Sequence, residues 1–145
     1  MSVKLIYIPL IYMRDHGMYP PTRPTLWYFN WQCDVWDTLT ELKIPTIWKA
    51  GPRTSNLVDP MKYRESKIIR YSEKKLSREL KKVTHAIVDF PSTPLMEALH
   101  HTIPTLCMVP PWDKEYIRDE YKHLIEVTNQ PRMNIVKFLQ KEGVV

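Results

Sequence analysis

The stretch "HAIVDFPSTPLMEALHHTIPTLCMV", residues 85–109, contains the pattern that decides the fold. Two short runs that are apolar almost throughout, 85–90 and 103–109, flank a segment of helical composition at 94–101. Strands that are apolar on both faces are typical of parallel sheets, and two parallel strands need a crossover connection. The stretch therefore predicts a strand–helix–strand unit of an α/β protein.

The same alternation of strands and helices extends over the whole chain of 145 residues. Further strands are predicted at 3–10, 45–50, 66–71 and 124–127. Further helices are predicted at 26–42, 73–82, 113–123 and 133–142. This order predicts a doubly wound parallel sheet of the Rossmann-like type, with helices on both faces in three α/β/α layers.

We expect one domain over residues 1–145, because the length suits a single core. The proline-rich segment 11–25 is expected to be a mobile loop, and residues 143–145 to be a frayed end. Within the helix at 26–42, apolar residues recur at helical spacing and predict the buried face: Leu26, Phe29, Cys33, Trp36 and Leu39.

The formal net charge is +5, which suits nucleic acid, anionic metabolites or a membrane surface as partners. No run of five or six basic residues occurs, so we expect no nucleic-acid partner. The segment "SEKKLSRELKK", residues 72–82, mixes both signs and predicts a solvated helix face. Cys33 and Cys107 fit neither a disulfide framework nor a zinc pattern, which favours a reducing compartment, the cytoplasm.

Only three glycines occur, so neither G-x-G-x-x-G nor the P-loop motif is present. A phosphate would have to be bound in another way, such as by a helix N-terminus that carries hydroxyl side chains. Pro91 predicts a turn after the strand, Ser92 or Thr93 a helix cap, and Pro94 the first helical turn. An anion at this helix end would gain roughly 0.3–1 kcal/mol from the helix dipole.

Glu97 lies five residues after Ser92 and four after Thr93, so it is not the partner in a capping box. It lies one turn into the helix on the side of Thr93, where a carboxylate can accept hydrogen bonds from the two hydroxyls of a ribose. Two alternatives stay open. In the first, the hydroxyl of Ser92 or Thr93 serves only as an ordinary N-cap of the helix. In the second, Glu97 is a surface residue whose negative charge the helix dipole favours.

Residues 85–113 resemble a signature in the C-terminal half of GT-B glycosyltransferases. The similarity is to bacterial surface-polysaccharide enzymes and to the related CDP-glycerol (polyglycerol-phosphate) transferases. The matching residues are Asp89, Ser92, Thr93, Glu97, Ala98, Leu99 and Pro104. Upstream, "TIWKAGPR" resembles the family's strand that ends in Lys-x-x-Pro, although Gly51 stands where the family often has histidine.

The resemblance implies that the chain binds a nucleotide-diphosphate sugar, the donor substrate, in polysaccharide biosynthesis. Ser92 and Thr93 would hold the diphosphate, and Lys49 and Arg53 would neutralise its charge. No metal and no further cofactor are expected, because no Asp-x-Asp motif occurs. No residue of the sequence is assigned as the catalytic group.

The resemblance also implies a site for the nucleoside and a missing second half. Glu97 would bind the ribose, and the loop after Arg70 and Tyr71 would contact the base. A complete GT-B enzyme has two such domains, so we expect this chain to need a second half-domain or partner chain and to be inactive alone. Two alternatives stay open: a half of a CDP-glycerol-type glycerophosphotransferase, or a non-catalytic interaction subunit of a split transferase that contacts a membrane peripherally.

Overall fold

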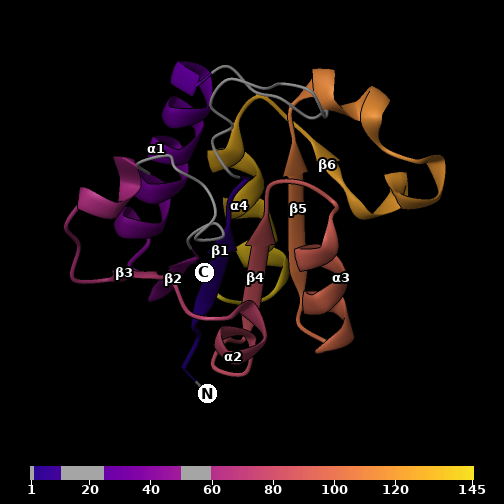
Figure 1. The fold of residues 1–145 in the computed structure, drawn as a ribbon. Coiled ribbons are helices and arrows are strands. Elements are labelled where there is room, and N and C mark those ends of the chain that lie inside the picture. The colour runs from indigo at the N-terminus through magenta and orange to yellow at the C-terminus, as the bar shows by residue number, and fades with distance from the viewer. Residues whose placement is uncertain (1, 11–24, 50–59) are drawn as a thin grey trace.

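The structure is a computed structural model that describes residues 2–10, 25–49 and 60–145 (Figure 1). It contains one six-stranded sheet in the order β3-β2-β1-β4-β5-β6, and every neighbouring pair is parallel. The strands are β1 (Leu5–Ile8), β2 (Thr46–Lys49), β3 (Ile69–Ser72), β4 (His85–Val88), β5 (Thr105–Val109) and β6 (Glu126–Val127). The predicted doubly wound, Rossmann-like α/β fold is confirmed.

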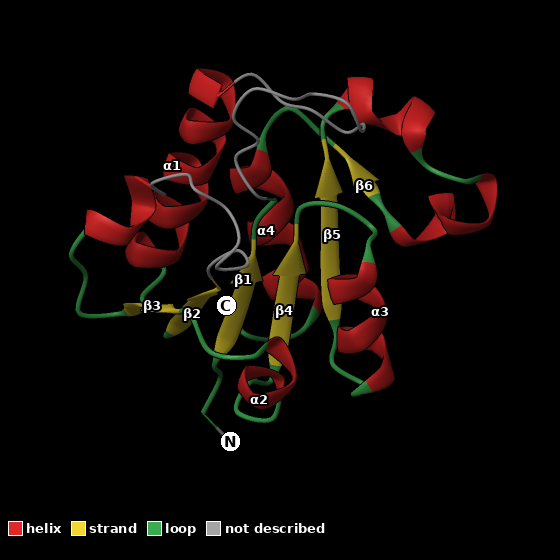
Figure 2. Ribbon diagram, in the orientation of Figure 1, coloured by secondary structure: helices red, strands yellow, loops and turns green. Residues whose placement is uncertain are grey.

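The helices cover both faces of the sheet (Figure 2). The α-helices are α1 (Thr25–Glu41), α2 (Leu76–Leu80), α3 (Thr93–His100) and α4 (Pro131–Lys141). The 3-10 helices are η1 (Pro60–Tyr63), η2 (Pro111–Tyr116) and η3 (Asp119–Leu124). Helices α1 and α4 pack on one face and α2 and α3 on the other, which produces the three layers.

Successive residues of the strands enter two different cores. In β1, Leu5 and Tyr7 belong to the core under α1 and α4, whereas Ile6 and Ile8 belong to the core under α2 and α3. Side chains alternate across a strand, so a sheet covered on both faces needs apolar residues at every strand position. This requirement explains the continuous apolar runs of the sequence.

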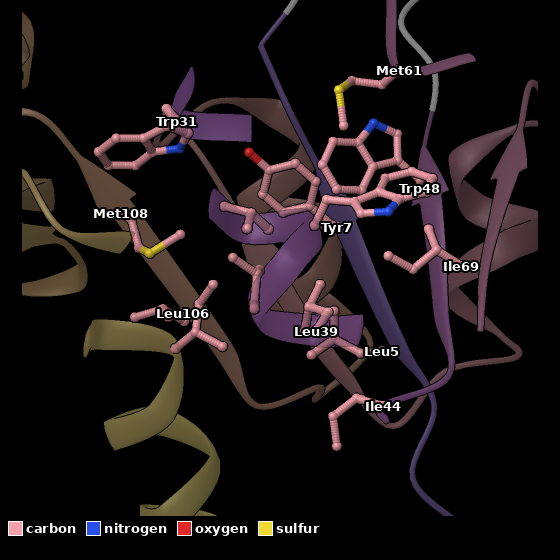
Figure 3. Close-up of a cluster of buried hydrophobic side chains, with 14 of the residues drawn as sticks. Leu5, Tyr7, Trp31, Leu39, Ile44, Trp48, Met61, Ile69, Leu106 and Met108 are labelled. Atoms are coloured by element: carbon pink, nitrogen blue, oxygen red, sulfur yellow. The ribbon is translucent and has the colours of Figure 1, made fainter. Parts of the chain in front are cut away.

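The core under α1 and α4 is rich in aromatic rings (Figure 3). The ring of Trp48 in β2 lies 4.4 Å from that of Tyr7 in β1 and 5.2 Å from that of Trp36 in α1, between centroids. These contacts join two neighbouring strands to the long helix. They therefore fix α1 relative to the ends of β1 and β2.

Of the buried face predicted for α1, Trp36 and Leu39 are buried, and Phe29 and Cys33 are partly buried against the same core. Leu26 is 72% exposed, whereas Tyr28 and Trp31 are buried. The buried stripe runs through Tyr28, Trp31, Val35 and Leu39, again at helical spacing. Burying two large aromatic side chains removes more apolar surface from water than burying Leu26 does, so the helix is rotated toward them.

The single helix predicted at 113–123 is wrong, because two 3-10 helices, η2 and η3, occupy this region. Between them Ile117 has φ −103° and ψ 129°, which is extended backbone. The side chain of Ile117 is buried in the core under α2 and α3. An extended residue is needed to place that side chain inward, so the helix cannot continue through it.

Three helices end with a residue in the left-handed region. Lys43 follows α1 with φ 55°, Thr102 follows α3 with φ 56°, and Gly143 follows α4 with φ 72°. After Gly143, the amide of Val144 donates to the carbonyl of Leu139 at 2.8 Å. Val144 also packs against the core under α1 and α4. Residues 143 and 144, which were expected to be frayed, therefore form the C-terminal cap of α4.

Candidate functional site

The carboxyl ends of β1 and β4 form the place where a doubly wound sheet binds ligands. The two strands are neighbours, but α1 follows β1 on one face and α3 follows β4 on the other. The connections leave this edge in opposite directions, which makes it the topological switch point at which such sheets bind ligands. Residues 89–92 follow β4 at this edge, as Figure 1 shows. Of the expected loop 11–25, residues 11–24 lie outside the described residues and Thr25 begins α1. The segment with Arg53 also lies outside them.

The first residues of α3 present two exposed hydroxyl groups at this edge. Ser92 is the N-cap residue, with extended backbone at φ −112° and ψ −167°, but its side chain makes no capping hydrogen bond. Ser92 and Thr93 are both exposed. Ser92 therefore takes the backbone position of an N-cap while its hydroxyl bonds no amide of the helix.

Fewer backbone amides are open here than at an ordinary helix start, which leaves four. The amide of Ser92 donates to the carbonyl of Phe90 at 2.9 Å, and that of Leu95 to the carbonyl of Ser92 at 3.0 Å. Pro94 has no N–H. Among the described residues the amide of Thr93 therefore remains without an acceptor. The helix end offers one amide and two hydroxyls to an anion.

Lys49 is the last residue of β2, two strands away from β4, or about 10 Å at the usual strand spacing. Ile47 faces the core under α2 and α3, so Lys49, two residues later, lies on the same face as α3. Lys49 is half-buried. Burial lowers its pKa, and the carboxylates of Glu79 and Glu73 partly oppose this shift.

Glu97 lies on α3, four residues after Thr93 and therefore on the same side of the helix. Its side chain is half-buried and makes no ion pair with any described residue. Thr93 and Glu97 thus occupy successive turns of one helix. The structure brings together Ser92, Thr93 and Glu97 at the start of α3. Lys49 lies at the same carboxyl edge of the sheet but two strands away from β4.

Arg70 and Tyr71 lie within β3, which continues to Ser72, so the loop associated with the base begins at Glu73. The two side chains point to opposite faces of the sheet. The guanidinium of Arg70 lies 3.0 Å from Oε2 of Glu79, and Tyr71 packs against the core under α1 and α4. Both side chains are therefore engaged within the protein.

Asp89 has a role that the motif did not reveal. Its carboxylate is buried, and Oδ2 accepts hydrogen bonds from the hydroxyls of Tyr7 and Tyr28, the latter at 2.6 Å. The hydroxyl of Tyr28 accepts in turn from the amide of Leu10 at 2.6 Å. This network connects β1, α1 and β4 at the carboxyl edge of the sheet. An aspartate that directly follows an apolar strand was the signal for it.

A pair of indoles also lies at this edge of the sheet. Trp112, in η2 after β5, is 40% exposed and meets Trp27 of α1 edge-on, with 4.4 Å between ring centroids. The pair connects the start of α1 with the segment that follows β5. Sequence patterns do not predict such a contact, because the two residues are far apart in the chain.

A separate hollow of about 390 Å³ lies away from this edge. It is bordered by Thr105, the first residue of β5, by residues 123–126 and by α4. The amino end of β5 is at the opposite edge of the sheet from Ser92.

Within the described residues, no three His, Cys, Asp or Glu side chains are grouped as metal ligands. No helix in the same part of the chain is long and apolar enough to cross a membrane.

No model of a known protein family matches this chain, and no curated protein matches it either.

Proposed function

We propose that this chain binds the diphosphate of a nucleotide-diphosphate sugar at the carboxyl edge of its sheet. The observation that carries the proposal is the exposed start of α3, where the hydroxyls of Ser92 and Thr93 make no capping bond beside the switch point between β1 and β4. The resemblance of residues 85–113 to the GT-B signature supports the choice of ligand. The helix dipole and the open Thr93 amide both favour an anion there.

The chemistry of glycosyl transfer fits these groups. Breaking the bond between sugar and phosphate leaves negative charge on the departing diphosphate, and fixed hydroxyl and amide donors stabilise such charge. Lys49 supplies a cation on the same face of the sheet, and Glu97 accepts from the ribose hydroxyls. The catalytic base and the acceptor site belong to a second half-domain or a partner chain, so this chain alone binds the donor without turnover.

The compartment proposed for this reaction is the cytoplasm. Among the described residues, neither Cys33 nor Cys107 forms a disulfide. Free thiols persist where the environment is reducing. A cytoplasmic location would also supply nucleotide-activated donors.

Calorimetric titration with UDP, CDP, GDP and TDP tests the proposal. We expect saturable binding of at least one nucleotide, and at least a tenfold loss of affinity in Ser92→Ala/Thr93→Ala, because a hydrogen bond to a charged group contributes about 1.5–3 kcal/mol. The control is Ser77→Ala/Thr40→Ala, which removes two exposed hydroxyls elsewhere. Absence of binding by the folded wild-type chain would reject the proposal. Exclusive binding of CDP would favour a glycerophosphotransferase.

Lys49 has a separate test within the same titration. Lys49→Ala removes the cation at the end of β2, so nucleotide affinity should fall several-fold at neutral pH. The control, Lys137→Ala on α4, removes an exposed lysine and should leave affinity unchanged. Equal affinities of both variants would exclude Lys49 from the site while leaving the proposal for α3 intact.

A further inference from the structure

The surface around α2 carries an excess of positive charge, although its sequence mixes both signs. Glu79 is completely buried, and its carboxylate oxygens lie 3.0 Å from Arg70 and 3.1 Å from Lys82. The other acid of the segment, Glu73, pairs with Lys62 at 3.2 Å. The predicted solvated face is present, since the charged residues of 72–82 other than Glu79 are exposed. Folding changes its balance of charge, because Glu79 is buried and Glu73 is paired with Lys62.

What remains on the surface is basic. Lys74, Lys75, Arg78 and Lys81 are all exposed, and within the described residues none of them pairs with a carboxylate. Arg70 and Lys82, the two cations that pair with Glu79, are also exposed. We call all six cations together the α2 basic surface: Arg70, Lys74, Lys75, Arg78, Lys81 and Lys82. A cluster of four to eight lysines and arginines is the usual size of an electrostatic site for anionic lipids.

We propose that the α2 basic surface binds the anionic headgroups of a phospholipid bilayer. Four of its six cations are lysines, which act as compact point charges and suit mobile headgroups, whereas specific phosphate recognition favours the bidentate fork of arginine. Residues 72–82 contain no aromatic side chain on which bases could stack, and Tyr71 faces the opposite core. A planar anionic surface therefore fits better than a nucleic acid.

Helix α2 runs back from the carboxyl edge of the sheet toward its amino edge. Just after α2, the amide of Thr84 donates to the carbonyl of Lys4 at 2.7 Å, so the end of this helix lies at the amino edge of the sheet. Figure 1 shows α2 near the N-terminus of the chain. Lys74 and Lys75, in contrast, follow the carboxyl end of β3, the edge at which α3 starts. The α2 basic surface therefore reaches from the carboxyl edge of the sheet to its amino edge.

The test is cosedimentation of the full chain with vesicles. Phosphatidylcholine vesicles with 30–40% phosphatidylserine (roughly the content that gives a strong surface potential) are compared with pure phosphatidylcholine. The variant Lys74→Ala/Arg78→Ala/Lys81→Ala removes three unpaired cations, and each is worth about a fivefold change in partitioning. The matched control, Lys114→Ala/Lys137→Ala/Lys141→Ala, removes three exposed lysines from other elements.

We expect the wild-type chain to bind only the anionic vesicles and to dissociate as salt is raised. The α2 variant should lose partitioning on the order of 100-fold, and the control less than tenfold. Failure of the wild type to bind, or an equal loss in both variants, would overturn the proposal. So would binding of a single-stranded oligonucleotide or an acidic peptide at a salt concentration that releases the vesicles. Circular dichroism of each variant verifies that it is folded, and none of these readings depends on nucleotide binding.

Discussion

The hydroxyl of Tyr28 donates a hydrogen bond of 2.6 Å to the carboxylate of Asp89, a residue 61 positions later in the chain. The same hydroxyl accepts a hydrogen bond from the amide of Leu10, just beyond the end of β1. One side chain of α1 thus bonds to the residues that follow β1 and β4, the two strands at the switch point of the sheet. The position of α1 is therefore coupled to the shape of the candidate site.

Tyr28→Phe should lower the free energy of unfolding by about 1–3 kcal/mol, because it leaves a buried carboxylate oxygen and an amide each short of one partner. Urea unfolding followed by circular dichroism measures the change. Tyr63→Phe is the control, since Tyr63 is 70% exposed and its hydroxyl should matter by less than about 0.5 kcal/mol. Equal stability of the two variants would show that the Tyr28 hydroxyl contributes nothing.

Glu79 should make the fold sensitive to acid. Burial by itself raises the pKa of Glu79, but hydrogen bonds from Ser72, Lys82 and Arg70 outweigh it and lower the pKa to about 2. A carboxyl group with a depressed folded pKa contributes stability above its unfolded pKa, and this contribution is lost as pH falls toward the folded pKa. The loss between about pH 4.5 and pH 2 should be on the order of 3 kcal/mol.

Glu79→Gln should therefore be less stable than the wild type at pH 7 and should lose less stability on acidification. Urea unfolding at several pH values between 2 and 7 (roughly spanning the window above) measures this difference. Glu65→Gln, at an exposed position, should reproduce the wild-type pH profile. Parallel profiles of the wild type and Glu79→Gln would contradict the role assigned to Glu79.

Lys43→Gly should stabilise the protein by about 0.5–1 kcal/mol. Lys43 has φ 55°, which costs an L-residue roughly 1–2 kcal/mol, and glycine avoids most of this cost at the end of a helix. Part of the gain is cancelled by the extra freedom of glycine in the unfolded chain. Thr40→Gly, still inside α1, should give no gain. Thermal unfolding distinguishes the two, and a destabilised Lys43→Gly would refute the interpretation.

The sheet could be predicted because its signal is local. Continuous apolar runs such as 85–90 reflect burial on both faces, and helical segments between them require parallel pairing. The rotation of α1 could not be predicted in the same way. Its helix contains apolar residues on several sides, and only the space between the strands and α1 decides that Tyr28 rather than Leu26 is buried.

The candidate site was predictable only where its residues are close in sequence. Ser92, Thr93 and Glu97 lie on one helix, so their spacing already indicates their relation. The contacts of Asp89 with Tyr7 and Tyr28 depend on tertiary packing across distant segments. The sign of the α2 surface also depends on tertiary packing, because the sequence does not reveal that Glu79 is buried.

The most direct measurement for the proposed function is the amide resonance of Thr93 during a titration with a nucleoside diphosphate, recorded by ¹H–¹⁵N NMR. If the diphosphate binds at the start of α3, this open amide should shift in a saturable manner together with neighbouring amides of the same turn. Amides at the amino edge, such as that of Thr105, should stay unchanged. A nucleotide that binds while the Thr93 resonance stays fixed, or a titration in which no resonance moves, would exclude α3 as the diphosphate site.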